Sequence, residues 1–174
     1  MAMSAVLLLR FLAFATIITI NVGSCNGNLG VPACKESEKQ ALLMFKQDFE
    51  DLSSRLSSWV AQGLDCCSWT GVVSDKLTGH IRRLHLGFKL LSDSDSPLGG
   101  KINPSLLKLE YLHFLDLSDN LFEGMQIPSF LGSLKSLSHL DLSDSGYFHG
   151  TVPHQLGNLS SLVYLSLSGL GCAV

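Results

Sequence analysis

Two sets of side chains in this sequence could do chemistry: the cysteines, and a series of histidines and aspartates. Cys66 and Cys67 are adjacent in the segment DCCSWTGVV. Adjacent cysteines rarely bridge each other, because a disulfide needs Cα atoms roughly 4.4–6.8 Å apart and a fixed torsion about the S–S bond. Each therefore needs a partner elsewhere, and the other cysteines are Cys25, Cys34 and Cys172.

Histidine and aspartate side chains recur at equivalent positions of a repeated pattern. His85, Asp116 and Asp141 occupy one such position. Carboxylates next to an imidazole can ligate a metal or transfer protons. However, no thiol or serine stands beside a base at a recognisable spacing, and an open strand surface lacks a pocket that excludes water. We therefore expect no catalytic residue, no metal and no cofactor, and predict that the protein is not an enzyme.

The pattern that carries these residues is a leucine repeat. Leu115, Leu140 and Leu165 follow one another at steps of 25 residues within the motif Leu-x-x-Leu-x-Leu, and a weaker copy contains Leu84. Several positions match in register, and the period is typical of leucine-rich repeats. Because Leu-x-Leu has the two-residue period of a strand, stacked copies bury their leucines beneath a parallel sheet. The sequence predicts an α/β leucine-rich-repeat solenoid with a parallel concave sheet.

The turns after the strands are expected to differ between copies. Asn120 follows one strand, where its amide can satisfy buried backbone groups. Ser145, at the equivalent position of the next copy, can do so only in part, while Lys89 and Leu170 cannot. We expect looser turns at these last two positions.

The segment before the repeats is predicted to cap the open end of the stack, as a solenoid requires. Ser37 to Gln40 forms a capping box ahead of an apolar run with one helical face. A short hairpin over 72–86 then leads into the repeats. The helical face comprises Leu42, Phe45, Phe49 and Leu52, with Trp59 and Trp69 as apolar plugs.

The N-terminus has the order of a secretory signal peptide. Arg10 precedes an apolar run over 11–20, and small residues follow it. Cleavage after Ser24 would retain Cys25, whereas cleavage after Gly27 would remove it. Secretion makes disulfides possible. No other apolar stretch is long enough to span a membrane, so we expect no membrane segment in the mature chain.

The composition and length bound the organisation. The net charge of −3 gives no support for nucleic-acid binding. We expect a signal peptide at 1–24, a helical cap at 25–80, and about three and a half repeats at 81–174, truncated at the C-terminus. The last leucines would then have an open flank, so we expect low stability or self-association.

Several stretches resemble a known family. LDLSDNLFEGMQIPSFLGSLKSL and GTVPHQLGNLSSL resemble plant extracellular leucine-rich repeats, and CKESEKQALLMFKQDFEDLSSRLSSW with DCCSWTGVV resembles the cap that precedes them. The resemblance covers about residues 34–174. It is nearest to the plant receptor-like proteins, membrane-tethered surface receptors without a kinase domain. Receptor kinases and polygalacturonase inhibitors share the cap.

The resemblance implies a cysteine pairing. It implies that Cys34 bridges Cys66, and that Cys67 should bridge the residue seven positions further on, which is Ser74 here. This departure leaves Cys67 as a free thiol, or paired with Cys25 if the signal leaves that residue in place. Cys172 occupies an inward-facing repeat position, held by Leu91, Phe122 and Tyr147 in the other copies, and is expected to be a small core residue.

The side chains between the leucines are expected to form the concave face and bind a partner. Basic and aromatic groups on a rigid sheet suit a protein or peptide ligand. Asn158 lies in a glycosylation sequon, Asn158-Leu159-Ser160. The candidate partner-binding residues are Arg83, His85, Phe114, Asp116, His139, Asp141 and Tyr164.

Together these features predict an extracellular recognition scaffold. The expected protein is the ectodomain fragment of a receptor-like protein in defence or developmental signalling, with an extracellular protein or peptide ligand and a co-receptor as partners. It would lie in the apoplast, or at the plasma membrane as part of a longer receptor. The alternative is a soluble inhibitor of polygalacturonase.

Overall fold

The computed structural model describes residues 32–63, 65–89, 95–122, 124–146, 148 and 150–169. These residues belong to a compact unit over 31–174. The predicted signal peptide, Cys25 and Cys172 lie outside the described residues, as do Leu91, Tyr147 and Leu170.

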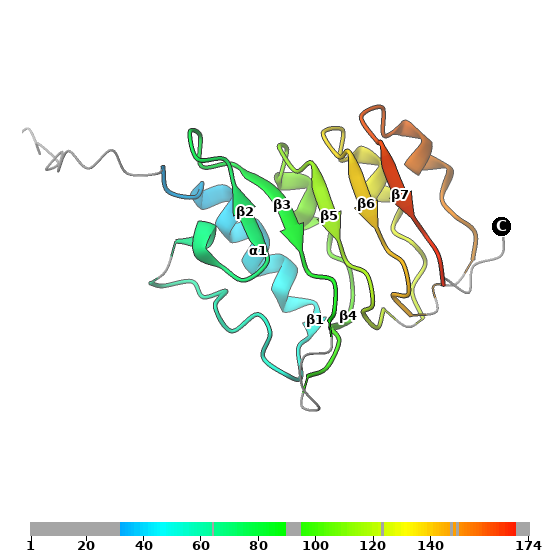
Figure 1. Cartoon of the computed structure of the whole chain (residues 1–174), viewed down its shortest axis with the longest axis horizontal. Coiled ribbons are helices and arrows are strands. Elements are labelled where there is room, and N and C mark those ends of the chain that lie inside the picture. The colour runs from blue at the N-terminus through cyan, green and yellow to red at the C-terminus, as the bar shows by residue number, and fades with distance from the viewer. Residues whose placement is uncertain are drawn as a thin grey trace, which may run out of the picture. The chain divides into compact units, whose positions relative to one another are not determined.

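A five-stranded sheet forms the front of this unit (Figure 1). The first two strands pair antiparallel as the predicted hairpin, and the remaining pairs are parallel. Leu84, Leu115, Leu140 and Leu165 are adjacent in register across the parallel strands, which confirms the predicted solenoid. In sheet order the strands are β2 (Val72–Ser74), β3 (Ile81–His85), β5 (Phe114–Asp116), β6 (His139–Asp141) and β7 (Tyr164–Ser166).

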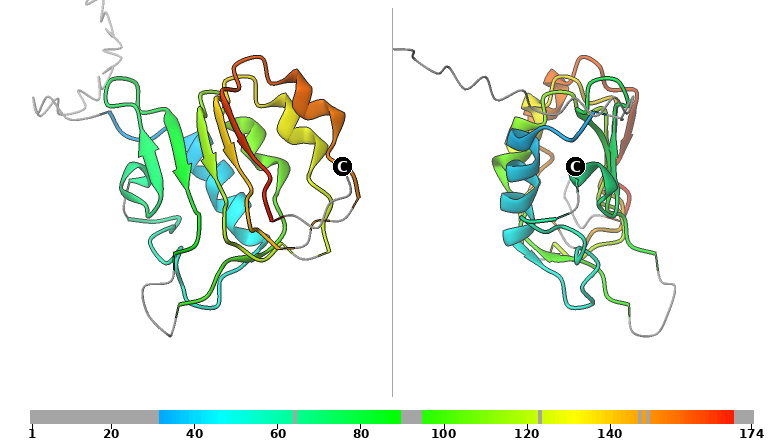
Figure 2. Two further views of the ribbon diagram at one scale, coloured as in Figure 1. Left: turned by 45° about the vertical axis from the view of Figure 1, so that its right-hand side comes forward. Right: turned by 90° about the vertical axis from the view of Figure 1, so that its left-hand side faces the viewer.

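Short helices form the layer behind the sheet (Figure 2). The three helices of the repeats, η2, η3 and η4, each follow an asparagine or proline cap and bury a leucine. A small antiparallel sheet joins β1 (Phe49–Glu50) to β4 (Gly99–Gly100). The helices are α1 (Glu36–Gln47), η1 (Cys66–Ser68), η2 (Pro104–Lys108), η3 (Ser129–Ser133) and η4 (His154–Asn158).

The core lies between these layers and opens at one end. Leu84, Leu115 and Leu140 are fully buried, whereas Leu165 on β7 is 43% exposed. No strand in the described ranges pairs with the outer edge of β7. Behind the sheet, the buried ring of the third copy is Phe148, whose centroid lies 6.1 Å from that of Phe122.

The cap helix is shorter than the sequence pattern predicted. The prediction that Phe49 and Leu52 continue its apolar face is wrong, because α1 ends at Gln47 and Phe49 pairs with Gly100 in β1. Leu52 is consequently 85% exposed. The capping box is also wrong, since Ser37 lies inside the helix and the N-cap is Lys35, which makes no side-chain cap bond.

The first-turn residue Glu38 instead ties the cap to the first repeat. Its side chain is 3% exposed, with Oε2 accepting a 2.7 Å bond from the backbone N–H of Ile81 and Oε1 lying 2.8 Å from His80 Nδ1. A buried carboxylate needs such partners, because an unpaired charge in the interior is costly. These contacts fix α1 against β3.

Aromatic packing and a disulfide complete the cap. Trp59 and Trp69 are both buried and stack with centroids 5.6 Å apart, in the plug role predicted for them. Cys34 and Cys66 form a disulfide with a Cα–Cα distance of 5.6 Å. The fold prediction of a helical, disulfide-containing cap followed by a parallel concave sheet is thus confirmed.

The predicted role of Asn120 is confirmed, and an unpredicted arginine extends it. Asn120 Nδ2 donates to the carbonyls of Leu86, Leu117 and Ser118, while Oδ1 accepts from the N–H of Leu98. In the next copy, Ser145 Oγ reaches the Leu117 and Ser143 carbonyls and so replaces the asparagine only in part.

At the cap end, Arg55 supplies the donors that Lys89 cannot. Its guanidinium donates to the carbonyls of Leu86 and Gly87 and to Asn120 Oδ1, at 3.0–3.1 Å. The backbone carbonyls of the first turn are therefore satisfied by Arg55 of the cap, together with Asn120. Arg55, Asn120 and Ser145 form a polar series that follows the strands.

Candidate functional site

The parallel register of the strands aligns four side chains across the concave face. Arg83, Phe114, His139 and Tyr164 are paired neighbours on β3, β5, β6 and β7. The rings of Phe114 and His139 stack at 4.0 Å with an angle of 12°, and those of His139 and Tyr164 at 4.1 Å with 6°. The guanidinium carbon of Arg83 lies 4.4 Å from the Phe114 centroid. We call this row the aromatic column.

A second basic residue borders the column but is already engaged. Arg82 Nη1 lies 2.6 Å from His113 Nε2, and Nη2 lies 3.6 Å from Asp75. Because arginine can only donate, Nε2 must accept, so His113 carries its proton on Nδ1 and donates it to the Ser136 carbonyl at 2.8 Å. These contacts join the β2–β3 hairpin to the next repeat.

The neighbouring row contains His85, Asp116 and Asp141, also in register. Each aspartate uses Oδ1 to accept bonds from the backbone N–H and the hydroxyl of the serine two residues on, Ser118 or Ser143. One oxygen of each carboxylate thus holds the turn that follows its strand. This is a scaffold role.

His85 lies beside the column, with its ring 4.3 Å from that of Phe114. Partial burial lowers the pKa of His85, the positive charge of Arg83 lowers it further, and Asp116 opposes them. Burial disfavours the charged imidazolium, as does a nearby cation.

In the described part of the chain, one cluster of three potential metal-binding side chains occurs, Cys34, Asp65 and Cys66. Two of its members form the disulfide, so their sulfurs are not free to ligate. The aspartates of the concave face do not belong to it.

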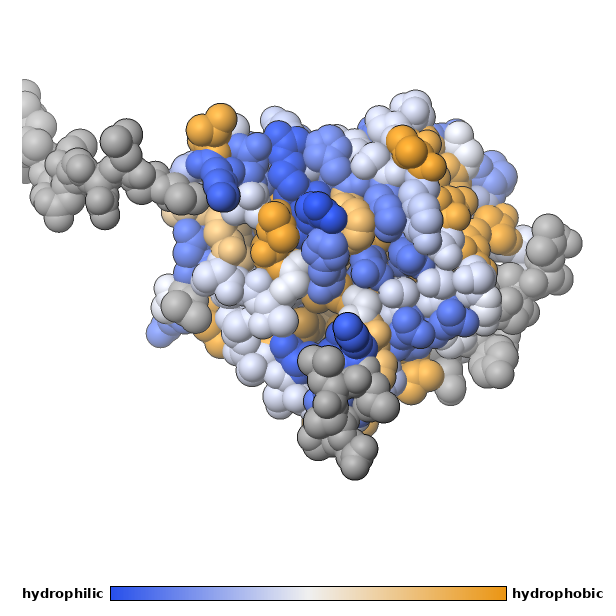
Figure 3. Space-filling view, in the orientation of Figure 1, coloured by the Kyte–Doolittle hydropathy of each residue, from blue (hydrophilic) through white to orange (hydrophobic). Residues whose placement is uncertain are grey.

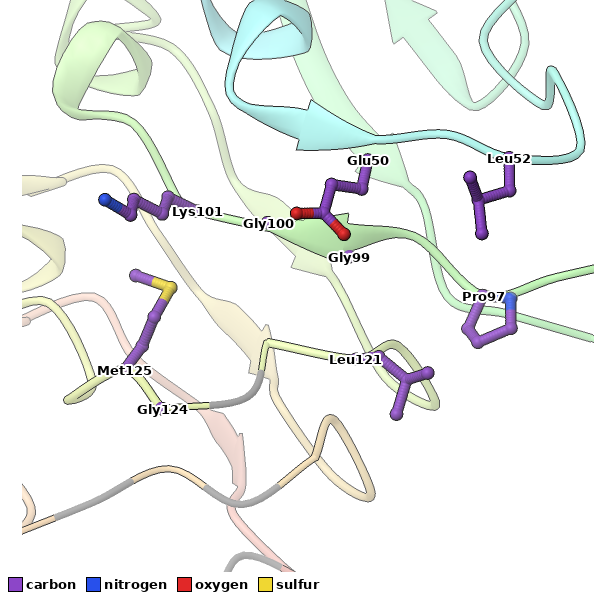
Figure 4. Close-up of a pocket in the computed structure, with 9 residues that line it drawn as sticks. All are labelled: Glu50, Leu52, Pro97, Gly99, Gly100, Lys101, Leu121, Gly124 and Met125. Atoms are coloured by element: carbon purple, nitrogen blue, oxygen red, sulfur yellow. The ribbon is translucent and has the colours of Figure 1, made fainter.

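A hollow of about 450 Å³ lies beside β1 and β4 (Figure 4). Glu50 projects over Gly99 and Gly100, and Lys101 and Met125 line the other end (Figure 4). A shallow hollow of about 430 Å³ lies on the concave face itself. Its lining residues are Arg83, His113, Phe114, Ser138, His139, Val163 and Tyr164.

The concave face is mainly hydrophilic in Figure 3, with hydrophobic residues gathered toward β7. Val163 is 90% exposed there, and Tyr164 and Leu165 are each nearly half exposed. The face thus offers an apolar end beside the charged and aromatic column.

Cys67 is a free thiol in the structure. Burial raises the pKa of Cys67 most, and Asp65 raises it further, while a hydrogen bond with the Ser74 side chain acts in the opposite direction. Ser74, at the position where the resemblance implied a cysteine, is thus near enough to act on the pKa of Cys67. Asn158, the sequon residue, is exposed at the end of η4.

Sequence patterns did not indicate Arg55, Glu38 or Arg82 as contact residues. Arg55 and Glu38 act across sequence separations of 31 to 65 residues, so no local pattern could reveal their partners. The strand sequence IRRLH does place Arg82 next to Arg83, but it does not specify that Arg82 contacts Asp75 and His113.

Comparison with known proteins gives a consistent result. A family model described as the leucine rich repeat N-terminal domain matches residues 35–73. The receptor-like protein EIX2 of Solanum lycopersicum is 47% identical over 106 residues, covering 59% of this chain and 10% of that protein. The chain spans about a tenth of the length of the curated relatives it matches.

Two solved structures resemble the fold closely. The BIR3–SERK2 complex from Arabidopsis thaliana matches with a TM-score of 0.65 and 32% identity, over 76% of this chain and 68% of that one. The PEPR1–AtPEP1 structure matches with a TM-score of 0.65 and 28% identity, over 79% of this chain and 18% of that one. In the described residues, no helix is long and apolar enough to cross a bilayer.

Proposed function

Because the chain belongs to the plant leucine-rich-repeat receptor-like proteins, we propose that its concave sheet recognises an extracellular protein or peptide. The observation that carries this proposal is the in-register aromatic column of Arg83, Phe114, His139 and Tyr164. Arginine and aromatic side chains dominate the energetics of many interfaces. Ring stacking holds these side chains in place before a ligand arrives, so that binding costs little conformational entropy.

The setting proposed for this surface is a receptor. The similar structures named above, BIR3 with SERK2 and PEPR1 with AtPEP1, each pair a protein with a second one, which supports a ligand and a co-receptor as partners. The similarity to EIX2 favours a receptor-like protein in defence or developmental signalling over a polygalacturonase inhibitor. The turn-forming role of Asp116 and Asp141 supports a non-catalytic face.

The proposed organisation is a signal peptide at 1–24, a cap at 25–80 and repeats at 81–174. The Cys34–Cys66 disulfide supports passage through the secretory pathway, since disulfides persist in oxidising compartments. The location is then the apoplast, or the plasma membrane as part of a longer receptor.

A random peptide library displayed against the secreted chain tests the proposal. We expect enriched peptides whose affinity falls about tenfold or more in His139→Ala and Tyr164→Ala, as for interface anchors. His154→Ala on η4, behind the sheet, is the matched control and should bind like wild type. Failure to enrich any peptide, or equal binding by all variants, would refute a concave recognition site.

Asn158 is proposed to be glycosylated during secretion. Its side chain is exposed, and η4 lies in the layer behind the sheet, so a glycan there would leave the concave face open. The expected result is a mass shift on intact protein that disappears in Asn158→Gln and in Ser160→Ala. An unchanged mass in the wild-type protein after deglycosylation would contradict it.

A further inference from the structure

The concave face divides into two rows of opposite character that run across the strands. The aromatic column begins with Arg83 and contains His139. The next row along the strands begins with His85 and contains the carboxylates of Asp116 and Asp141. Because the strands are parallel and in register, both rows run along the solenoid axis, about 4.8 Å per strand.

The positive row has an available cation. Arg82 is held by Asp75 and His113, but Arg83 is exposed, and no carboxylate in the described ranges lies within ion-pairing distance of it. Its guanidinium lies over the face of Phe114. A guanidinium in this position keeps its in-plane N–H donors at its edge, where a carboxylate can accept two of them.

The acidic row has available acceptors. Asp116 and Asp141 each use Oδ1 within their own turns. The other oxygen of Asp141 has only a 3.4 Å contact from the Tyr164 hydroxyl, and that of Asp116 has no hydrogen-bond donor among the described residues. Both carboxylates can therefore accept bonds from a cation.

The rings between the charges favour oxygen-rich and apolar groups. Phe114, His139 and Tyr164 stack face to face, so a ligand meets their edges rather than their faces. The edge of an aromatic ring is its electropositive part, which attracts carbonyl and carboxylate oxygens. The exposed Val163 and Tyr164 extend this surface with apolar area.

We propose that the concave face binds an extended peptide segment of a partner protein, laid across β3 to β7, with acidic and basic side chains at alternating positions. Side chains of an extended segment alternate in direction. One set of side chains therefore meets Arg83 and the other meets Asp116 and Asp141. The inference rests on the proposed function and adds the charge pattern of the ligand.

The test uses the secreted full chain and a synthetic peptide with glutamate and lysine at alternating positions, flanked by leucines. Acetylated and amidated ends remove the terminal charges, so that only side chains are read. Binding is measured by fluorescence anisotropy, together with peptides in which every glutamate, or every lysine, is replaced by glutamine. Both replacements are expected to weaken binding.

The decisive variant is Arg83→Glu, with Lys101→Glu as its control. Lys101 is an exposed cation in the hollow beside β4, so both variants change the net charge equally. A glutamate at position 83 would repel the glutamates of the peptide, so Arg83→Glu should weaken binding about 10- to 100-fold while Lys101→Glu changes it little. A peptide carrying lysine in place of glutamate should regain affinity for Arg83→Glu.

Three outcomes would overturn the inference. Equal losses in the two variants would show that only net charge matters, and equal binding of the glutamine peptides would show that no charge pattern is read. Absence of binding by the alternating peptide would also refute it. The proposed function would still stand if library peptides bound the concave face without charge preference, and it would fall with the inference if no peptide bound.

Discussion

Ser74 stands where the resemblance implied the disulfide partner of Cys67. Cys67 is a free thiol, and the Ser74 side chain is near enough to act on its pKa. Ser74→Cys should therefore form a second bridge, and closing a loop of about eight residues stabilises a protein by about 2–3 kcal/mol in the chain-entropy model. The expected result is loss of the titratable thiol and a higher Tm. Ser74→Ala, which cannot bridge, should not raise the Tm.

His85 should make the free energy of unfolding depend on pH, with a sign that follows from its lowered pKa. The folded-state pKa lies below the ordinary value of 6.5, so the unfolded chain binds more protons just below that pH. The free energy of unfolding should therefore fall as the pH drops through this window. His85→Gln should reduce this fall, as measured by urea unfolding at several pH values. An NMR titration placing the pKa of His85 at or above 6.5 would contradict the prediction.

At the scale of elements, the buried polar side chains in the turns that follow the strands should contribute more to the free energy of unfolding than any single surface contact. Asn120 is buried and satisfies five groups, among them the Leu98 N–H and the Arg55 guanidinium. Asn120→Ala would leave several of these unpaired at about 1–3 kcal/mol each, so we expect a loss of at least about 3 kcal/mol in urea unfolding. Ser145→Ala, which removes one hydroxyl, should cost less. Equal costs would mean that the asparagine is not the principal support of the turn.

The same elements show what a single sequence can predict. The strands and their register followed from the spacing of Leu115, Leu140 and Leu165, because a repeated apolar pattern has one good way to bury itself. The end of α1 did not follow, because the competing pairing of Phe49 with Gly100 joins residues about fifty positions apart. Tertiary pairing overrode a favourable helical pattern.

The candidate site divides in the same way. The four residues of the aromatic column were among the candidate partner-binding residues, because the repeat spacing alone places Arg83, Phe114, His139 and Tyr164 at equivalent strand positions. Their mutual stacking, and the engagement of Arg82 by Asp75 and His113, depend on side-chain conformations that spacing does not specify.

At the scale of the whole molecule, the edge strand β7 presents exposed apolar side chains. Leu165 is 43% exposed although its register partner Leu140 is fully buried, and Val163 beside it is 90% exposed. An apolar strand at a sheet edge, without a partner in the described ranges, is a template for association. We therefore expect the secreted chain to self-associate as its concentration rises, as seen by sedimentation velocity.

Leu165→Lys should weaken this association about tenfold, because covering a half-exposed leucine contributes on the order of 1–2 kcal/mol. Leu77→Lys is the matched control, since Leu77 is 89% exposed but lies in the β2–β3 turn, away from the flank. A lysine there should leave association unchanged, because a single exposed leucine outside a sheet edge offers no strand to pair. A chain that stays monomeric at all concentrations, or responds equally to both lysines, would show that the β7 edge does not control assembly.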